Sequence, residues 1–335
     1  MTNNIGRLLK NTLKTIILPV GLYAIFMIAN RLMGNVTFGV GDSLDLMIRQ
    51  LIPSTFIALG MCVGMLSGRW DFSIGAVVLL SAIIGANLAT QFQLGAFGLL
   101  LICSLTAVII STFSGIVYLI LRIPPMIATL GLVMVYESLS GVLFNGRGAT
   151  IISNKEMTIF VKSPNIYILT VIFMALFYFV VKYTKFGYDM RSLAGGQQLA
   201  INIGVKEKKN VLMAFAFAGI FLGIAATMHV SFQVVKPAAN LTSTAIMFTG
   251  ITPVIIGLYL ARFSNIPIGI LMGNLANNIL VTGLIALGLN STLQTVISGF
   301  ALLLFIGLTG SQVNMTSGAS MKLKKLKTAL TEKTP

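Results

Sequence analysis

The feature that most constrains this chain is a series of long apolar runs that follow one another from Thr15 to Thr309, separated by short charged, Gly- or Pro-containing segments. One crossing of a bilayer takes roughly 20 apolar residues, so the chain has room for about ten crossings. Only 9% of the residues are charged, against about 25% in soluble domains. A water-soluble enzyme is therefore excluded, and the sequence predicts a multi-pass protein of the lipid bilayer.

The apolar runs predict helices rather than a β-barrel, because each run is continuous whereas barrel strands alternate in polarity over about ten residues. The expected fold class is all-α, with a tail at residues 1–14, a transmembrane domain at 15–309 and a basic tail at 310–335. The ten predicted spans are residues 15–33, 46–67, 73–90, 94–121, 126–144, 165–181, 211–230, 243–260, 266–289 and 293–309.

The distribution of Lys and Arg predicts the orientation in the membrane. With alternating spans and a cytoplasmic N-terminus, 17 of the 23 Lys and Arg residues lie on the cytoplasmic side and 6 on the other. Cytoplasmic loops carry such an excess of basic residues, so both termini are expected inside the cell. The same short clusters explain the net charge of +15. They form no continuous basic surface, and we expect no nucleic-acid partner.

Conventional catalytic and metal chemistry finds no support in the sequence. Cys62 and Cys103 fall inside apolar runs and are expected to behave as small hydrophobic residues. His229 is the single histidine, with no carboxylate or cysteine beside it to complete a metal site. No Gly-Lys pair occurs, so the phosphate-binding loop of ATPases is missing. We predict neither a cofactor nor a metal, and a chain that is not itself an enzyme.

Glu137 is the one acid that lies well within a predicted span. An ionisable side chain inside the bilayer costs several kcal/mol unless it faces a cavity or a partner. Two interpretations stay open. The carboxylate lines the path of a transported solute, or it reaches toward water near the helix end or pairs with Arg147 or Arg49.

Uncharged polar residues also occur inside the predicted spans. Asn274 and Asn278 are four residues apart and share one helix face, with Asn277 beside them. Asn87 lies in the third span. Such amides either hold helices together or line a path, and the first role is the commoner one in membrane proteins.

Asp71 lies in the short segment between the second and third spans, with Ser73 two residues later. This spacing favours a structural cap at the start of the third helix over direct contact with a solute.

The longest cytoplasmic connection, residues 182–210, contains the sequence SLAGGQQLAINIGV. The Gly195-Gly196 pair breaks any preceding helix, and the residues after it permit a short second helix. From composition alone, a solvated connector and a functional segment stay equally open.

Three stretches together resemble the permease subunits of bacterial sugar-type ABC importers, the family that includes the ribose and xylose permeases. They are GRWDFSIGAVVLLSAIIGANLAT, IPPMIATLGLVMVYESLSGVLFNGRGATI and FGYDMRSLAGGQQLAINIGVKEKKNVLMAFAFAGIFLGIAA. The likeness extends over almost the whole chain in order, and the last stretch is its most specific part.

The resemblance implies a permease subunit in the bacterial cell membrane. Its expected partners are an ABC ATPase subunit, an extracytoplasmic solute-binding protein, and a second permease subunit, identical or homologous. The cytoplasmic segment would then form the coupling helix that docks into the ATPase. The residues that carry this role over are Gly195, Gly196, Gln197, Ala200, Ile203 and Gly204.

The chain also departs from the family pattern. Glu137 stands where relatives tend to have Arg, and GLYLARFSNIPIG replaces a Gly-rich run between the eighth and ninth spans. A diverged importer of a small polar solute, a monosaccharide, is therefore expected, and a nucleoside permease is the alternative within the family. A secondary transporter is the alternative of another class, although it would need coupling-ion groups near the midplane.

Overall fold

A computed structural model describes residues 2–34, 38–290, 292–294 and 296–307, and these residues form an all-α protein. In the described part of the chain the only β pairing is an isolated bridge between Ala149 and Val235. The helices are α1 (Thr2–Leu32), α2 (Asp42–Leu66), α3 (Ile74–Gln91), α4 (Gly95–Leu121), α5 (Pro125–Val142), the short η1 (Leu143–Gly146) and η2 (Ile159–Val161), α6 (Asn165–Tyr183), α7 (Lys185–Gly195), α8 (Gln197–Asn202), α9 (Glu207–Phe232), α10 (Thr244–Leu260) and α11 (Ile266–Ala286). A further apolar helix covers described residues of Thr292–Gly307.

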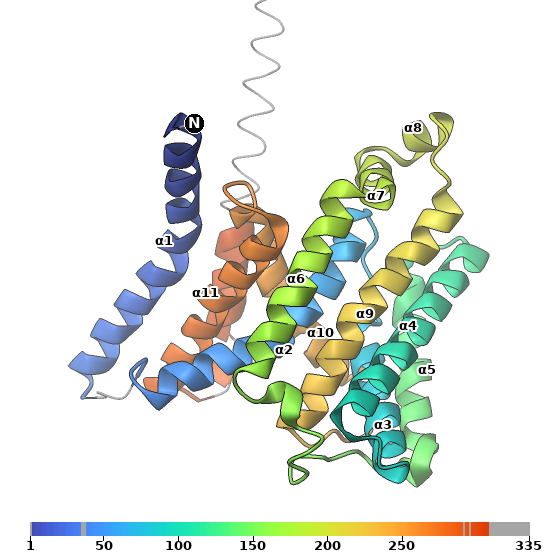
Figure 1. The fold of residues 1–335 in the computed structure, drawn as a ribbon, viewed down its shortest axis with the longest axis horizontal. Coiled ribbons are helices and arrows are strands. Elements are labelled where there is room, and N and C mark those ends of the chain that lie inside the picture. Colours follow the sequence, from blue (N-terminus) through green and yellow to red (C-terminus); the bar gives the residue numbers. More distant parts are fainter. Residues whose placement is uncertain (1, 35–37, 291, 295, 308–335) are drawn as a thin grey trace, which may run out of the picture.

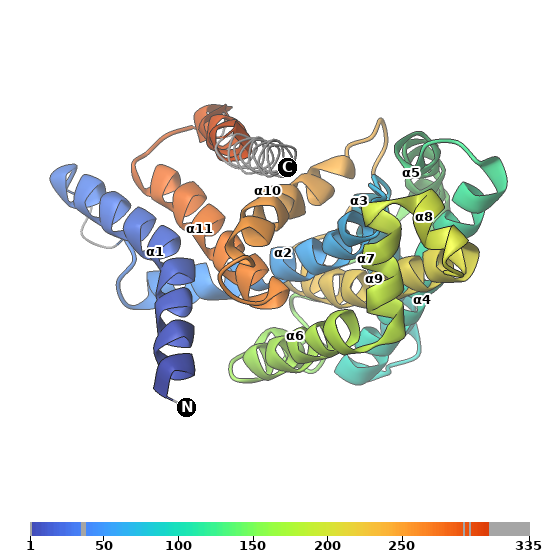
Figure 2. The same cartoon turned by 90° about the horizontal axis from the view of Figure 1, so that it is seen from above.

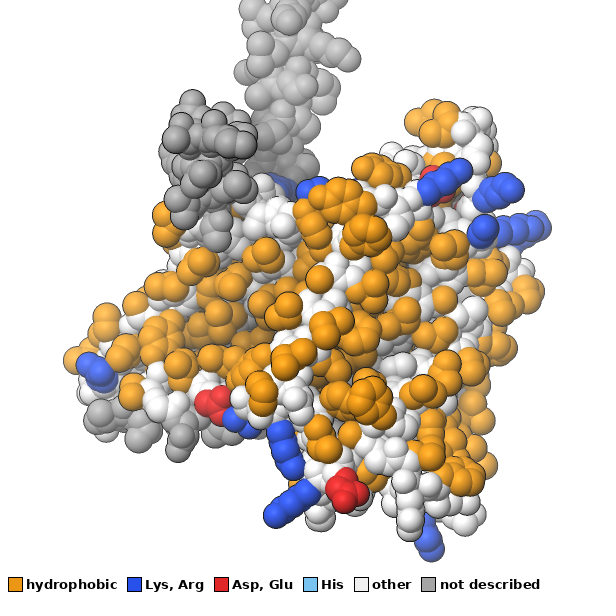
Figure 3. All heavy atoms as spheres, in the orientation of Figure 1, with side chains coloured by type: hydrophobic (Ala, Val, Ile, Leu, Met, Phe, Trp, Pro, Cys, Tyr) orange, Lys and Arg blue, Asp and Glu red, His pale blue; other side chains and the backbone are white. Residues whose placement is uncertain are grey.

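The helices confirm an all-α polytopic membrane protein. Each of the ten predicted spans coincides with a helix, and eight described helices are long and apolar enough to cross a bilayer. The other two, Thr244–Leu260 and Thr292–Gly307, are shorter, so ten crossings stay a prediction. Hydrophobic side chains cover the broad middle of the molecule, and charged side chains gather toward its two ends (Figure 3).

The arrangement of the helices is consistent with the predicted orientation, and which end of the molecule faces the cytoplasm stays a prediction. The start of α1 and the short helices α7 and α8 lie at the same end of the molecule (Figure 1), as a common cytoplasmic side requires. Because α1 begins at Thr2, the predicted tail of residues 1–14 is largely helical. The predicted basic tail at 310–335 lies outside the described residues.

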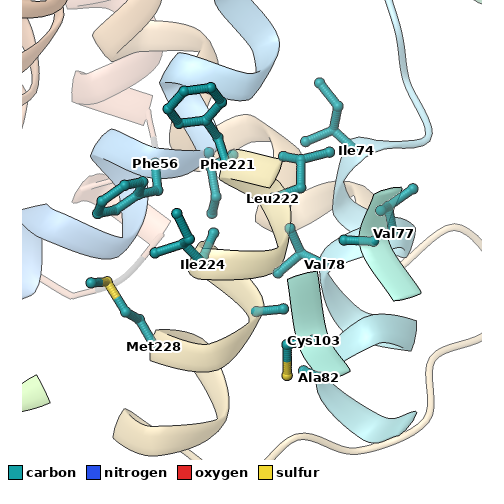
Figure 4. Close-up of a cluster of buried hydrophobic side chains, with 14 of the residues drawn as sticks. Phe56, Ile74, Val77, Val78, Ala82, Cys103, Phe221, Leu222, Ile224 and Met228 are labelled. Carbon is teal, nitrogen blue, oxygen red and sulfur yellow. The ribbon is translucent and has the colours of Figure 1, made fainter. Parts of the chain in front are cut away.

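Helix α9 is the centre of the core. Of its most apolar stretch, 78% of the residues are buried, and its side chains meet those of α2, α3 and α4 around Phe56, Val78 and Leu222 (Figure 4). The rings of Phe217 and Phe221 pack edge to face with centroids 5.1 Å apart. Seen from above, α1 and α11 lie toward one end and α4 and α5 toward the other, with α2 and α9 between them (Figure 2).

Small residues let these helices approach closely, and the sequence has G-x-x-x-G spacings at Gly219/Gly223 and Gly269/Gly273. A Cβ atom added at Gly219 of α9 would lie 2.6 Å from Val108 Cα of α4, and one at Gly273 of α11 would lie 2.6 Å from Gly257 N of α10. Neither contact leaves room for a side chain. The backbone-to-backbone packing of α4 on α9 and of α10 on α11 therefore depends on glycine.

Candidate functional site

A cavity of about 920 Å³ lies between α2, the end of α9, α10, α11 and the helix after α11. Its apolar lining side chains include Ile57, Phe232 and Phe248. Its polar lining residues are Gln50, Ser54, His229, Gln233, Thr249, Thr252, Asn274, Asn277, Asn278, Gln294 and Ser298. No Asp, Glu, Lys or Arg is among the described residues that line it. The lining is typical of a site for an uncharged molecule that carries both apolar faces and hydrogen-bonding groups.

The three amides of α11 line this cavity but differ in how they are used. Asn274, only 1% exposed, donates from Nδ2 to Leu51 O (2.5 Å), Ser54 Oγ (2.9 Å) and Thr55 Oγ1 (2.7 Å). Its Oδ1 accepts from Ser54 Oγ at 3.2 Å. Asn274 therefore joins α11 to α2 with both ends of its amide, while also forming part of the cavity wall.

Asn278, one turn further along α11, has a free acceptor. Its Oδ1 is buried and has no hydrogen-bond partner among the described residues, and the side chain lines the cavity. Buried polar atoms are almost always paired, so an unpaired one needs an explanation. The oxygen itself is closed to solvent, so the donor of a hydroxyl-bearing solute would reach it only after the Asn278 side chain turns toward the cavity.

His229 and Gln233 line the cavity from the end of α9. The Gln233 side-chain nitrogen lies 2.8 Å from His229 Nδ1. They are four residues apart, so the end of the helix places both on one side. The sequence predicts no metal site at His229, because it has no metal-ligating neighbour.

Glu137 lies outside this cavity lining. It is 2% exposed on α5, and its carboxylate accepts the backbone N–H groups of Leu241 (2.8 Å to Oε2) and Ser243 (2.7 Å to Oε1). These amides precede α10, whose N-terminus carries partial positive charge. Asn240 and Leu241 have φ values of 56° and 63°, a backbone conformation that Asn adopts occasionally but that is unfavourable for Leu. The carboxylate thus holds a strained turn at the start of α10.

Asn87 and Asp71 also lie apart from the lining. Asn87 Nδ2 donates to Ile83 O of its own helix at 2.8 Å and to Gly148 O at 3.4 Å. Asp71 Oδ1 accepts from Ser73 N (2.8 Å) and Ser73 Oγ (2.6 Å). Ser73 is the residue that precedes α3, so Asp71 orders the start of α3 through Ser73 rather than by bonding to the helix itself.

The segment at residues 182–210, which is predicted to be cytoplasmic, forms two short helices with a break between them, as the Gly195-Gly196 pair predicts. Helix α7 ends at Gly195, α8 begins at Gln197, and Gly204 follows α8 with a φ of 95°. Leu199 and Ile203 are 71% and 79% exposed. The two side chains lie outside the apolar spans, so lipid does not account for their exposure, and they are candidates for a contact with a partner protein.

The predicted coupling residues divide between surface and core. Gly195, Gln197, Ile203 and Gly204 are exposed, and Gly196 is half-buried. Ala200 is only 2% exposed and packs inward. The large apolar side chains exposed here are Leu199 on α8 and Ile203 directly after it; the resemblance carries over Ile203, whereas it does not single out Leu199.

Comparison with known proteins decides the family. The family described as the branched-chain amino acid transport system / permease component matches residues 43–306. The chain belongs to this family. The cavity and the two-helix cytoplasmic segment both lie within the matched residues.

Curated relatives in this family are permease proteins. The galactofuranose transporter permease of Escherichia coli K12 is 27% identical over 193 residues, 55% of each chain. The autoinducer 2 import system permease of Photorhabdus laumondii is 25% identical over 254 residues, 74% of this chain and 75% of the relative. The ribose import permease of Escherichia coli K12 is 21% identical over 271 residues, 77% and 83% of the two chains.

The alignment to the galactofuranose permease spans about half of that protein. No solved structure matches the chain. The relatives and the family match confirm the predicted resemblance to sugar-type ABC importer permeases, in a diverged member.

Proposed function

We propose that this chain is the membrane permease subunit of an ABC importer, and that its cavity is part of the path for a small uncharged polar solute of the monosaccharide class. The observation that carries this proposal is a lining of amides, hydroxyls and one imidazole with no charged side chain among the described lining residues. Amides both donate and accept hydrogen bonds, as the hydroxyls of a sugar do.

The lining argues against a charged or zwitterionic cargo. The family description mentions branched-chain amino acids, whose ammonium and carboxylate groups would need paired charges or an equivalent set of dipoles on leaving water. The names of the relatives instead refer to ribose, galactofuranose and autoinducer 2. A neutral, hydroxyl-rich solute fits both the cavity and these relatives.

A nucleoside is the second candidate. Phe232 and Phe248 line the cavity and are 39% and 57% exposed, so both offer ring surface to a planar base. Aromatic faces stack on bases, whereas a simple furanose would leave these rings partly uncovered.

Partner subunits would supply the energy for transport and deliver the solute. We propose an ABC ATPase subunit that contacts α8 on the cytoplasmic side, an extracytoplasmic solute-binding protein on the opposite side, and a second permease subunit, identical or homologous, in the bacterial cell membrane. The sequence lacks a phosphate-binding loop of its own, consistent with a separate ATPase.

The test is uptake by the assembled transporter. The full chain, co-expressed with the ATPase subunit and the binding protein, is expected to accumulate one of D-ribose, D-galactose, D-xylose or adenosine when each is offered in radiolabelled form. Uptake that stops on ATP depletion but survives collapse of the ion gradients supports the importer. Uptake that follows the ion gradient instead would establish a secondary transporter, and accumulation of leucine alone would reject the neutral-solute assignment.

A further inference from the structure

An ion pair between a buried arginine and a partly exposed glutamate joins the cytoplasmic ends of two helices that also meet at the cavity. Arg69, in the turn between α2 and α3, is 5% exposed, and its Nη2 donates to Glu207 Oε1 at 2.9 Å. Glu207 is the first residue of α9, where a carboxylate also complements the helix N-terminus. The guanidinium is fixed by two further bonds, from Nη1 to Ser67 O (3.0 Å) and from Nε to Tyr118 Oη (3.4 Å).

The same Glu207 oxygen holds the cytoplasmic segment. Gln197, the first residue of α8, donates from Nε2 to Glu207 Oε1 at 2.6 Å. The turn that carries Arg69 also lies against the end of α7, because a Cβ at Gly68 would be 3.3 Å from Ala194 Cα. Oε1 of Glu207 is therefore the point where α8, α9 and the α2–α3 turn are connected.

Helices α2 and α9 carry this connection to the cavity. Helix α9 has 26 residues and is about 39 Å long, with His229 lining the cavity at its far end. Helix α2 supplies Gln50 and Ser54 to the same lining. Between the two ends the helices touch directly, since a Cβ at Gly60 would lie 2.7 Å from Leu222 Cδ2.

We propose that Glu207 is a positioning residue that transmits movement of the cytoplasmic segment to the cavity, by holding Gln197 and Arg69 on one oxygen. This inference rests on the proposed function, because it assigns the movement of α8 to an ATPase partner. When that partner displaces α8, Gln197 moves Glu207 and with it the start of α9. Arg69 meanwhile holds the end of α2 in place. The two helices then change their separation at the cavity.

The experiment reads the cavity without needing the identity of the solute. Gln50 is exposed on α2, and in Gln50→Cys it is a labelling site, whereas Cys62 and Cys103 are buried. The full chain with Gln50→Cys is co-purified with its ATPase subunit in nanodiscs. The rate of labelling by a membrane-impermeant maleimide is then measured in the resting state and after trapping with ATP and vanadate.

Glu207→Gln is compared with the parent and with Glu156→Gln, a matched change at an exposed acid. Trapping is expected to change the labelling rate in the parent and in Glu156→Gln. In Glu207→Gln the change is expected to shrink at least about fivefold, the lower range of coupling between sites, with the ATPase still bound and hydrolysing ATP. An undiminished response in Glu207→Gln overturns the proposal.

A second variant keeps the proposal testable if Glu207→Gln does not fold. Gln197 is exposed, so Gln197→Met removes the bond to Glu207 without disturbing the core, and it is expected to weaken the labelling response when that response is measured only in complexes that retain the ATPase. A full response in Gln197→Met overturns the proposal even if Glu207→Gln does not accumulate. A parent complex that binds no ATPase and shows no response to ATP would instead reject the proposed function.

Discussion

The junction between α5 and α10 and the cavity beside α10 both place polar side chains within the membrane domain, but they leave them in different states. At the junction, each oxygen of Glu137 accepts one backbone N–H group, and Ser140 Oγ accepts another from Ala238 at 3.2 Å. In the cavity, Asn278 Oδ1 has no partner among the described residues. An unpaired atom alone does not separate the two regions, because Ser243 Oγ at the junction also lacks a partner among the described residues; Asn278 differs in that its side chain lines the cavity.

The same contrast occurs within one face of α11. Asn274 and Asn278 are one turn apart and both line the cavity, yet Asn274 gives its amide to Leu51, Ser54 and Thr55. Residue type and spacing do not separate the two roles. The two roles are separated by the acceptor groups on α2, which face Asn274 and leave the Asn278 oxygen unbonded.

The largest expected effect is at the junction. Glu137→Gln keeps the shape but turns one acceptor oxygen into a donor that faces a backbone N–H group. Leaving a buried donor unsatisfied costs roughly 1–3 kcal/mol, and more where a charged partner is lost, so we expect a destabilisation of about 3 kcal/mol. Thermal unfolding in nanodiscs measures it as a lower Tm, with transport per folded molecule retained.

Glu156→Gln is the control for that measurement, because Glu156 is exposed, and its Tm is expected to stay unchanged. Should Glu137→Gln keep its Tm and lose transport instead, the junction would belong to the solute path. The assignment of Glu137 to the fold would then be wrong.

A smaller loss of stability is expected for Asn274→Leu. The substitution removes the donor to Leu51 O and leaves the two hydroxyls on α2 without their amide partner, which costs about 1–2 kcal/mol. The Tm is expected to fall while the KM for the solute changes little. A large rise in KM at constant Tm would show that Asn274 binds the solute despite its bonds to α2.

Asn278→Leu is expected to behave in the opposite way. Removing an unpaired buried oxygen leaves stability equal or slightly higher, because no protein bond is lost. The solute loses one hydrogen bond of about 1 kcal/mol, and we expect the KM for uptake to rise roughly fivefold. A wild-type KM, or a Tm as low as that of Asn274→Leu, would remove the distinction between the two amides.

The sequence predicted the helices well because hydrophobicity over 18 or more residues is a local property. Residue spacing predicted the pair of short helices around Gly196. It also predicted the common helix face of Asn274, Asn277 and Asn278. Spacing did not predict the hydrogen-bond partners of the polar side chains. The bonds from Leu241 and Ser243 to Glu137 span 104 and 106 residues, and no local pattern encodes them.

The sequence did not predict all of the residues that line the cavity, for a related reason. Gln50, His229 and Gln233 lie near the ends of spans, where polar residues are common and reach water without any special role. Only the folded chain brings the ends of α2 and α9 together beside α10. The one local signal was the i, i+4 spacing of His229 and Gln233 at the end of an otherwise apolar helix.

Asp71 is intermediate between the polar groups that are fully bonded and those that are left unpaired. The smallest change in Tm is expected here. Both hydrogen bonds that it receives go to Oδ1, from Ser73, and burial raises the pKa of its carboxyl above the ordinary value of 3.8, with those two bonds opposing the rise. A carboxyl whose pKa is higher in the folded chain favours folding below its unfolded pKa, and this contribution is lost as the pH rises through the folded pKa. Ionised Asp71 therefore lowers the stability of the fold at pH 7.

Asp71→Asn keeps an acceptor for Ser73 without the charge. Its Tm is expected to exceed that of the wild type slightly at pH 7 and to match it as the pH falls toward 3.8. A lower Tm at pH 7 would mean that attraction between the carboxylate and the N-terminus of α3 outweighs the cost of burial, and Asp71 would then belong with Glu137 among the acids that stabilise the fold.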